Sequence, residues 1–119
     1  MELPLFALHT VLFPGRSMTL HVFEDRYLQM MEQVLPESPF AIAAIRYGRE
    51  VGGTYDPYRV GVQVVPEDYE LDDDGTYTVQ VRAVERVRLL ELVASDPYVR
   101  WHVEALPEQG AVRRAIERA

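Results

Sequence analysis

The sequence predicts one mainly β domain, a barrel-like sheet with one internal helix and a short helical segment at the C-terminal end. Three observations support this fold class. Short runs of apolar and polar residues in alternation are separated by proline, glycine and Asp-Gly turn signals. One internal stretch carries apolar residues at helical spacing instead. The length of 119 residues fits a single domain that can bury a core.

The first predicted elements are two strands. Leu3–Leu8 alternates weakly and is expected to be a strand, with Pro4 at its start or on an edge, where the missing N–H does no harm. Pro14-Gly15 marks a turn, and Thr19–Phe23 is the second expected strand.

A helix is expected next. Glu24 and Asp25 place two carboxylates at its N-terminus, where the helix dipole favours negative charge. Pro36 ends it, because the residue before a proline is disfavoured in helical conformation. The apolar residues recur in steps of three, four and one and form one stripe: Phe23, Tyr27, Leu28, Met31, Val34 and Leu35.

The middle of the chain is expected to hold two strands and a loop. Phe40–Tyr47 is a short apolar run, typical of a buried strand, and Arg49–Arg59 is expected to be a loop. Val60–Leu71 resumes alternation, with Pro66 a bend or bulge. The Asp72–Gly75 segment is a strong hairpin signal, since glycine adopts a positive φ without steric cost.

The last strands follow this hairpin. A strand from Tyr77 is expected to break near Ala83 and to continue as Val84–Val93, with a turn at Asp96-Pro97. Val99–Val103 is then a half-buried strand with Trp101 pointing inward.

The C-terminal residues change pattern. Residues 1–107 are therefore assigned to the β domain, and residues 108–119 to the start of a helical segment, for which either a partner or further sequence is expected. Its apolar stripe would fold back on the barrel or meet a second subunit in a homo-oligomer, and consists of Val112, Ala115 and Ile116.

Composition excludes several kinds of site. All 12 basic residues are arginine, so neither a P-loop nor a Ser–Lys hydrolase site can form in this chain. Without cysteine there is no disulfide or thiolate metal site. The net charge of −7 argues against nucleic acid as a partner. No stretch approaches the ~20 apolar residues of a membrane span, and the N-terminus lacks the charge of a secretory signal. A cytoplasmic protein without cofactor is expected.

Motifs for metal binding or nucleophilic catalysis are weak. His9, His21 and His102 share no ligand spacing, so three independent imidazoles are expected. The Asp72–Asp74 run lacks the spacing of a calcium loop and fits a solvated hairpin tip. The three serines, at positions 17, 38 and 95, have no adjacent base. We therefore expect no catalytic residue and no metal ligand.

Four arginines leave two interpretations open. Arg82, Arg86, Arg88 and Arg100 could form a stripe that binds RNA phosphates. Interleaved glutamates, at positions 85, 91 and 104, instead favour a solvent-facing ladder of ion pairs.

Surface apolar residues offer the main binding candidates. An extended polypeptide could lie in a groove lined by loop tyrosines, which combine contact area with a polar tip. The alternative is that these side chains cover the ends of the barrel as core. The candidates are Leu12, Phe13, Pro14, Tyr55, Tyr58 and Tyr69.

The opening residues resemble the N-terminal domain of the ATP-dependent Lon proteases. That family reads Leu-Pro-Leu-Phe-Pro-Leu, then Leu-Phe-Pro-Gly, then Leu-x-x-Phe-Glu-x-Arg-Tyr into a helix. The matching stretches here are Leu3–Phe6, Leu12–Gly15 and Leu20–Tyr27. Later matches follow in order, at Val60-Gly61, Asp74-Gly75-x-Tyr77, Arg86–Arg88 and Pro97-Tyr98. Two departures, Ala7 in place of proline and Ala83 in place of glycine, affect only local turns.

The resemblance implies a PUA-like pseudobarrel that helps to capture unfolded or damaged proteins. In that family the ATPase and Ser–Lys protease modules lie downstream. The resemblance therefore implies a stand-alone Lon-domain protein or a fragment of one, which is a non-catalytic binding module linked to protein quality control. RNA binding is the alternative, because PUA-like barrels also bind RNA. A small-molecule pocket among aromatic residues is a third option.

Overall fold

The computed structural model describes residues 1–107, which form a mainly β domain with one internal helix, as the sequence predicts. The predicted C-terminal helix lies outside the described residues. The elements follow in the order β1 (Glu2–Leu8), β2 (Ser17–Val22), α1 (Asp25–Val34), β3 (Phe40–Gly48), β4 (Tyr55–Pro57), β5 (Val60–Leu71), β6 (Tyr77–Ala94) and β7 (Arg100–Ala105).

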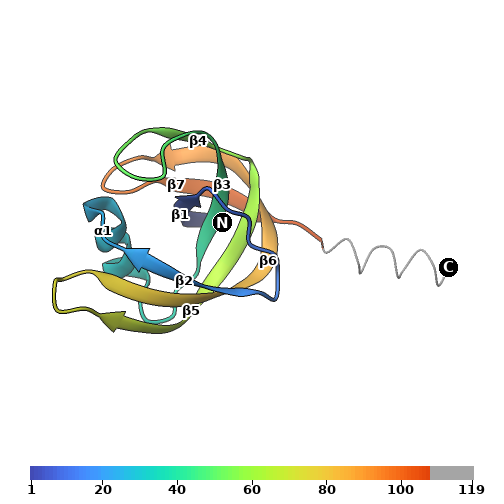
Figure 1. Ribbon diagram of the computed structural model, residues 1–119. Helices are drawn as coiled ribbons and strands as arrows, with labels where there is room; N and C mark the ends of the chain where they lie inside the picture. The colour runs from blue at the N-terminus through green and yellow to red at the C-terminus, as the bar shows by residue number, and fades with distance from the viewer. Residues whose placement is uncertain (108–119) are drawn as a thin grey trace.

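Five strands form a ring of pairings. The order runs β1-β7-β6-β5-β3 and returns to β1 through a parallel β1–β3 ladder, while every other contact in the ring is antiparallel (Figure 1). Two short strands lie outside the ring. β4 pairs antiparallel with the end of β3, and β2 pairs with β6 alone. This arrangement agrees with the predicted barrel-like sheet.

β6 joins the two halves of the sheet. Its first half pairs with β2 on one side and β5 on the other, and its second half pairs with β7. The predicted break near Ala83 is wrong, because β6 continues through it. Val84 is an extra residue at a bulge there, since Ala83 pairs with Val64 and Glu85 pairs with Gln63. A bulge interrupts alternation and bends a strand without ending it.

The core consists of two clusters with β1 and β3 between them. Phe6 and Leu8 of β1 join the larger cluster, which also contains the buried face of α1. Leu3 and Leu5 point the other way, into a smaller cluster around Trp101. Successive side chains of a strand point to opposite faces, so a strand between two cores is apolar throughout. This explains the continuous apolar run predicted as a buried strand at Phe40–Tyr47. Trp101 is buried, as predicted.

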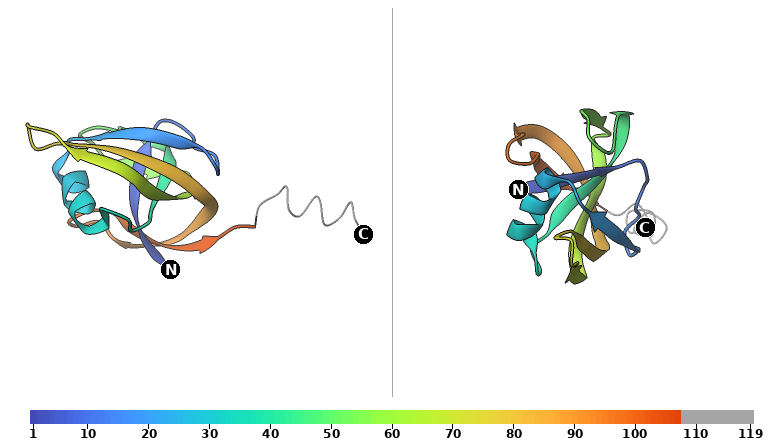
Figure 2. Two further views of the ribbon diagram at one scale, coloured as in Figure 1. Left: turned by 90° about the horizontal axis from the view of Figure 1, so that it is seen from below. Right: turned by 60° about the vertical axis from the view of Figure 1, so that its left-hand side comes forward.

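The helix α1 covers one end of the larger cluster, and the β5–β6 hairpin lies at that same end of the molecule (Figures 1 and 2). Tyr27, Met30, Met31 and Val34 are its buried residues. Phe23 does not belong to its stripe, contrary to the prediction, because it lies before the helix and its side chain is 52% exposed. Within residues 1–107, no helix is long and apolar enough to cross a membrane.

The predicted loop at Arg49–Arg59 contains a strand. β4 pairs with the end of β3, Tyr55 lying opposite Gly48. The pairing uses backbone groups alone, so a segment without alternation can form it. Gly48 permits the close approach with a φ of +108°, since a Cβ there would lie 2.3 Å from the Thr54 carbonyl oxygen.

The predicted β5–β6 hairpin is confirmed. Its tip is held by a bond from the Gly75 N–H to the Asp72 carbonyl, 3.0 Å, with Gly75 at a φ of +85°. The bulge expected at Pro66 is also present, with Glu67 as the extra residue, because Pro66 pairs with Val81 and Asp68 with Gln80.

Candidate functional site

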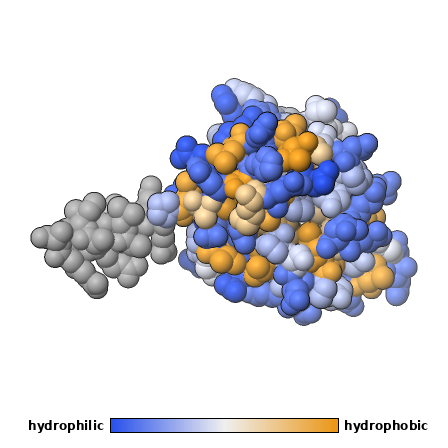
Figure 3. Space-filling model, turned by 180° about the vertical axis from the view of Figure 1, so that it is seen from behind, coloured by the Kyte–Doolittle hydropathy of each residue, from blue (hydrophilic) through white to orange (hydrophobic). Residues whose placement is uncertain are grey.

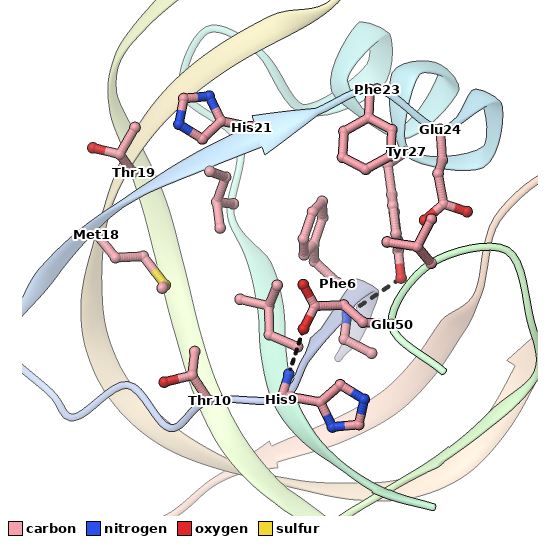
Figure 4. A pocket seen from close by; sticks show the side chains of 14 residues that line it. Phe6, His9, Thr10, Met18, Thr19, His21, Phe23, Glu24, Tyr27 and Glu50 are labelled. Carbon is pink, nitrogen blue, oxygen red and sulfur yellow. Dashed lines mark hydrogen bonds between the residues drawn. The ribbon is translucent and has the colours of Figure 1, made fainter. Parts of the chain in front are cut away.

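A pocket lies between two strand edges that carry no neighbouring strand among the described residues. It has a volume of about 410 Å³ and opens beside the start of α1 (Figure 4). Its lining consists of two runs of consecutive residues, Phe6–Thr10 and Met18–His21, together with Phe23, Glu24, Tyr27, Glu50 and Val51. Consecutive residues face opposite sides of a strand, so the pocket runs along the edges of β1 and β2.

Both edges are available for a reason of topology. β7 pairs with β1 only from Glu2 to Pro4, which leaves the second half of that edge without a strand. Among residues 1–107, β2 pairs with β6 and with nothing on its other side. An edge strand turns about half of its backbone N–H and C=O groups outward, where they can pair with another chain.

Side-chain oxygen atoms accept hydrogen bonds from the backbone N–H groups along the free edge of β1. The Ala7 N–H donates to the Tyr27 hydroxyl oxygen at 3.4 Å, and the His9 N–H donates to Glu50 Oε2 at 2.8 Å (Figure 4). The first of these bonds is long for an N–H···O contact, and the second has the normal length. Glu50 thus reaches from the β3–β4 loop into the mouth of the pocket.

The start of α1 positions the aromatic wall. The Tyr27 ring stacks on Phe6 with their centroids 4.1 Å apart, and the Arg26 guanidinium lies 4.7 Å from the Tyr27 ring. Burial raises the pKa of the Tyr27 and Tyr55 phenols above their usual value of 10.0, and the nearby Arg26 charge opposes the shift only in part. Both phenols therefore stay protonated at neutral pH.

Ionic and backbone contacts hold the β3–β4 loop against α1. Arg26 pairs with Glu24 at 3.3 Å and donates to the Glu50 carbonyl oxygen at 3.2 Å. The Gly52 N–H donates to Glu24 Oε2, also at 3.2 Å. The loop backbone is thus fixed by Glu24 and Arg26, independently of the Glu50 side chain.

Two half-exposed apolar side chains line this pocket. Phe23, between β2 and α1, is 52% exposed, and Val51, in the β3–β4 loop, is 51% exposed. Both border the pocket. Hydrophobic residues also reach the surface in several separate patches on the face seen in Figure 3. The pocket differs from such patches because it combines apolar side chains with unpaired strand edges.

A second cavity adjoins the first. It has a volume of about 300 Å³ and shares Thr10 with the first pocket. Leu12 and Tyr58, two of the predicted binding residues, line it together. Phe13 is 65% exposed and Pro14 half-buried, immediately after Leu12 in the chain.

The other predicted binding residues lie apart from these. Tyr55 is half-buried, packs against the smaller core cluster and lines a different cavity with Trp101. Tyr69 is exposed on β5 and borders a shallow depression beside the β5–β6 hairpin. The six predicted residues therefore do not form one groove.

The arginines expected as a stripe are mostly ion-paired. Arg82 pairs with Glu67 at 2.9 Å, Arg88 with Glu104 at 3.6 Å and Arg100 with Glu2 at 3.4 Å. The ladder interpretation is thus the better description, although two of its carboxylates, Glu67 and Glu2, come from strands other than those predicted.

The histidines and acidic residues form no metal cluster. Among residues 1–107, no group of three or more histidine, aspartate or glutamate side chains could hold a metal ion. His9, His21 and His102 are all exposed. Asp72 and Asp74 instead accept hydrogen bonds from Thr76 and Thr78 at the hairpin tip.

Sequence reasoning missed most of the pocket. Phe6, Leu20 and Tyr27 were assigned to strand or helix faces, and Glu50 to a featureless loop. In the sequence, Glu50 is visible only as an acidic residue between Arg49 and the Gly52-Gly53 pair. Its hydrogen bond with the His9 N–H forms only in the folded domain.

Comparisons with known proteins agree on one family. The family model for the substrate-binding domain of ATP-dependent protease La (LON) matches residues 2–119. Lon protease 1 of Bdellovibrio bacteriovorus is 27% identical over 113 residues, which cover 93% of this chain and 14% of that protein. Lon protease of Porphyromonas gingivalis is 30% identical over 112 residues, 90% of this chain and 13% of its own length. The chain thus spans a small part of the curated relatives it matches.

Solved structures show the same fold. A Lon N-terminal domain protein from Xanthomonas campestris has a TM-score of 0.70 at 28% identity and covers 99% of this chain and 72% of its own. The N-terminal domain of Mycobacterium avium complex Lon protease has a TM-score of 0.67, covering 91% of this chain and 56% of its own. At 17% identity, the second likeness shows the fold alone.

Proposed function

This chain belongs to the family of Lon substrate-binding domains, and from that premise we propose that it binds unfolded or damaged polypeptides through the pocket between β1 and β2. The family domain is itself non-catalytic. The protein would thus recognise unfolded chains in general and not one folded partner.

The observation that carries the proposal is an apolar pocket bounded by two unpaired strand edges. Native proteins bury most of their apolar segments, whereas unfolded chains expose them together with free backbone groups. A site that offers apolar contact and backbone pairing recognises both features and depends little on sequence. Phe23 and Val51 supply the exposed apolar rim.

We propose that the second cavity extends this surface. Because Thr10 borders both cavities, a chain in the first pocket can continue past it toward Leu12 and Tyr58, with Phe13 and Pro14 alongside. Tyr55 and Tyr69 border other cavities and are not part of this path.

The role in quality control is also a proposal. Bound chains would pass to a protease activity, which in the relatives resides in a protein about seven times longer than the matched segment. A cytoplasmic location and self-association remain predictions from the sequence.

A binding assay tests the proposed function. The protein is expected to retain a permanently unfolded protein, such as a reduced and carboxymethylated one, and not its native form. Phe23→Ser should weaken binding about fivefold, because about half of a phenylalanine side chain remains to be buried. Leu90→Ser is the matched control, since Leu90 is equally exposed, at 52%, and lines none of the described pockets. Equal retention of the native and unfolded forms would overturn the proposal.

A further inference from the structure

The free edge of β1 offers a row of backbone donors whose present partners are mostly side chains. We propose that an extended polypeptide adds as a new strand along β1 from Ala7 to His9, in place of the Tyr27 hydroxyl and the Glu50 carboxylate. This inference rests on the proposed function and specifies how the same pocket would hold its substrate.

Three N–H groups define the row. The Leu5 N–H donates to the Val99 carbonyl at 2.9 Å, and the Ala7 and His9 N–H groups follow on the same edge at steps of two residues. Alternate residues of a strand turn their N–H groups to one edge, and residues 5–8 of β1 lie in register with β3 along the other edge. The donors at positions 7 and 9 therefore continue a ladder that stops at Leu5.

An extended peptide fits this row better than a small ligand does. Alternate carbonyls of a strand are spaced by about 6.6 Å, the same two-residue repeat that separates the Ala7 and His9 N–H groups. A single carboxylate satisfies only one donor, as Glu50 does now. A strand carbonyl at about 2.9 Å would also improve on the 3.4 Å bond from Ala7 to the Tyr27 hydroxyl.

The pocket accepts the side chains of the added strand. Those that point inward would meet Phe6, Leu8 and Leu20, which are buried in the larger cluster and line the pocket. Thus backbone pairing gives affinity, and the apolar pocket selects alternating apolar residues.

Glu50 acts as an internal competitor in this arrangement. Its side chain reaches the His9 N–H (Figure 4). Its carbonyl oxygen is held separately by the Arg26 guanidinium at 3.2 Å. The carboxylate can therefore leave without release of the loop. Removing the carboxylate should leave the His9 N–H open to the peptide.

The first test compares variants in their binding of a short synthetic peptide with alternating apolar residues, followed by fluorescence anisotropy. Glu50→Ala is expected to bind about fivefold more tightly than the parent, because a competing hydrogen bond of ordinary strength is gone. Glu32→Ala, an exposed position on α1 away from the pocket, makes the same charge change and should leave affinity unaltered. Unchanged or weaker binding by Glu50→Ala overturns the inference.

The second test uses the unaltered protein, so it does not depend on the folding of a variant. Peptides of the same sequence carry N-methyl groups at either odd or even positions. Strand addition requires that one of the two sets loses binding, and that the peptide slows hydrogen exchange at the Ala7 and His9 amides. If both methylated peptides bind as well as the parent peptide, the strand mode is wrong and the proposed function stands. If neither this peptide nor an unfolded protein binds at all, the proposed function itself fails.

Discussion

Replacement of Gly61 by alanine tests a close approach between β3 and β5. Gly61 lies on β5 just before the residues that pair with β3. A Cβ at this position would lie 2.3 Å from the Ile42 carbonyl oxygen and 3.2 Å from the Cα and Cβ atoms of Ala43. Every one of these atoms belongs to β3 backbone or to an alanine, so no flexible side chain can move aside.

The cost follows from the geometry. To restore a Cβ contact of at least 3.0 Å, β3 and β5 must separate locally where Phe40–Ile42 pairs with Val62–Val64. Overpacking of this kind costs about 1–3 kcal/mol. Alanine also lowers the conformational entropy of the unfolded chain. Where no strain is present, this stabilises the folded state by about 0.4–1 kcal/mol. We expect Gly61→Ala to lower the free energy of unfolding by about 1–2 kcal/mol.

Urea unfolding measures this change. The midpoint should fall while the m-value stays constant, because the surface exposed on unfolding is unchanged. Gly53→Ala is the matched control. Its Cβ would meet only the Arg49 side chain, with Arg49 Cβ nearest at 3.0 Å, and the residue has no positive φ. If Gly61→Ala and Gly53→Ala unfold at the same midpoint, the close contact between β3 and β5 does not exist.

Three further changes test the site and the hairpin. Stability should fall as the pH rises above about 10, since burial raises the pKa of Tyr27 and Tyr55 in the folded protein and the unfolded chain releases these protons first. Between pH values below and above 10, the urea midpoint should fall less for Tyr55→Phe than for the parent protein. An equal fall in the two proteins would contradict the burial of the Tyr55 hydroxyl. Arg26→Ala should cost about 1 kcal/mol and speed hydrogen exchange in the β3–β4 loop, because the bond to the Glu50 carbonyl is lost; unaltered exchange there would show that Arg26 does not hold the loop. Gly75→Ala should cost about 1–2 kcal/mol through its φ of +85°, as judged by thermal unfolding, and no change would mean that the turn has another geometry.

Most of the fold could be predicted because its elements have local causes. Alternation identified β5 and β7, the Asp-Gly turn identified the β5–β6 hairpin, and Pro36 marked the end of α1. β4 could not be predicted, because its pairing with β3 depends on backbone groups and on where Gly48 turns the chain. The bulge at Val84 looked like a strand end for the same reason, since only the partner strand shows that pairing resumes.

The candidate site depends on contacts that no local sequence pattern indicates. Tyr58 and Leu12 line one cavity although 46 positions separate their numbers, and Tyr55, in β4, packs against the smaller core cluster. His9 and Glu50 are brought together by a loop that is anchored through α1. The sequence indicated which apolar residues could lie at the surface. Which of them lie next to one another depends on how the strands pair.

An unpaired strand edge is a hazard that proteins usually block. Charged side chains, prolines, bulges or a covering loop prevent edge-to-edge aggregation. Pro4 lies early in β1, and beyond it the edge relies on the Tyr27 hydroxyl and the Glu50 carboxylate. Side-chain caps of this kind prevent pairing with copies of the same chain only while they stay in place, and in the proposed binding mode they are displaced by a strand that also fills the pocket. The same Glu50 contact that caps this edge would therefore set the threshold for substrate, and its removal should increase self-association together with peptide affinity.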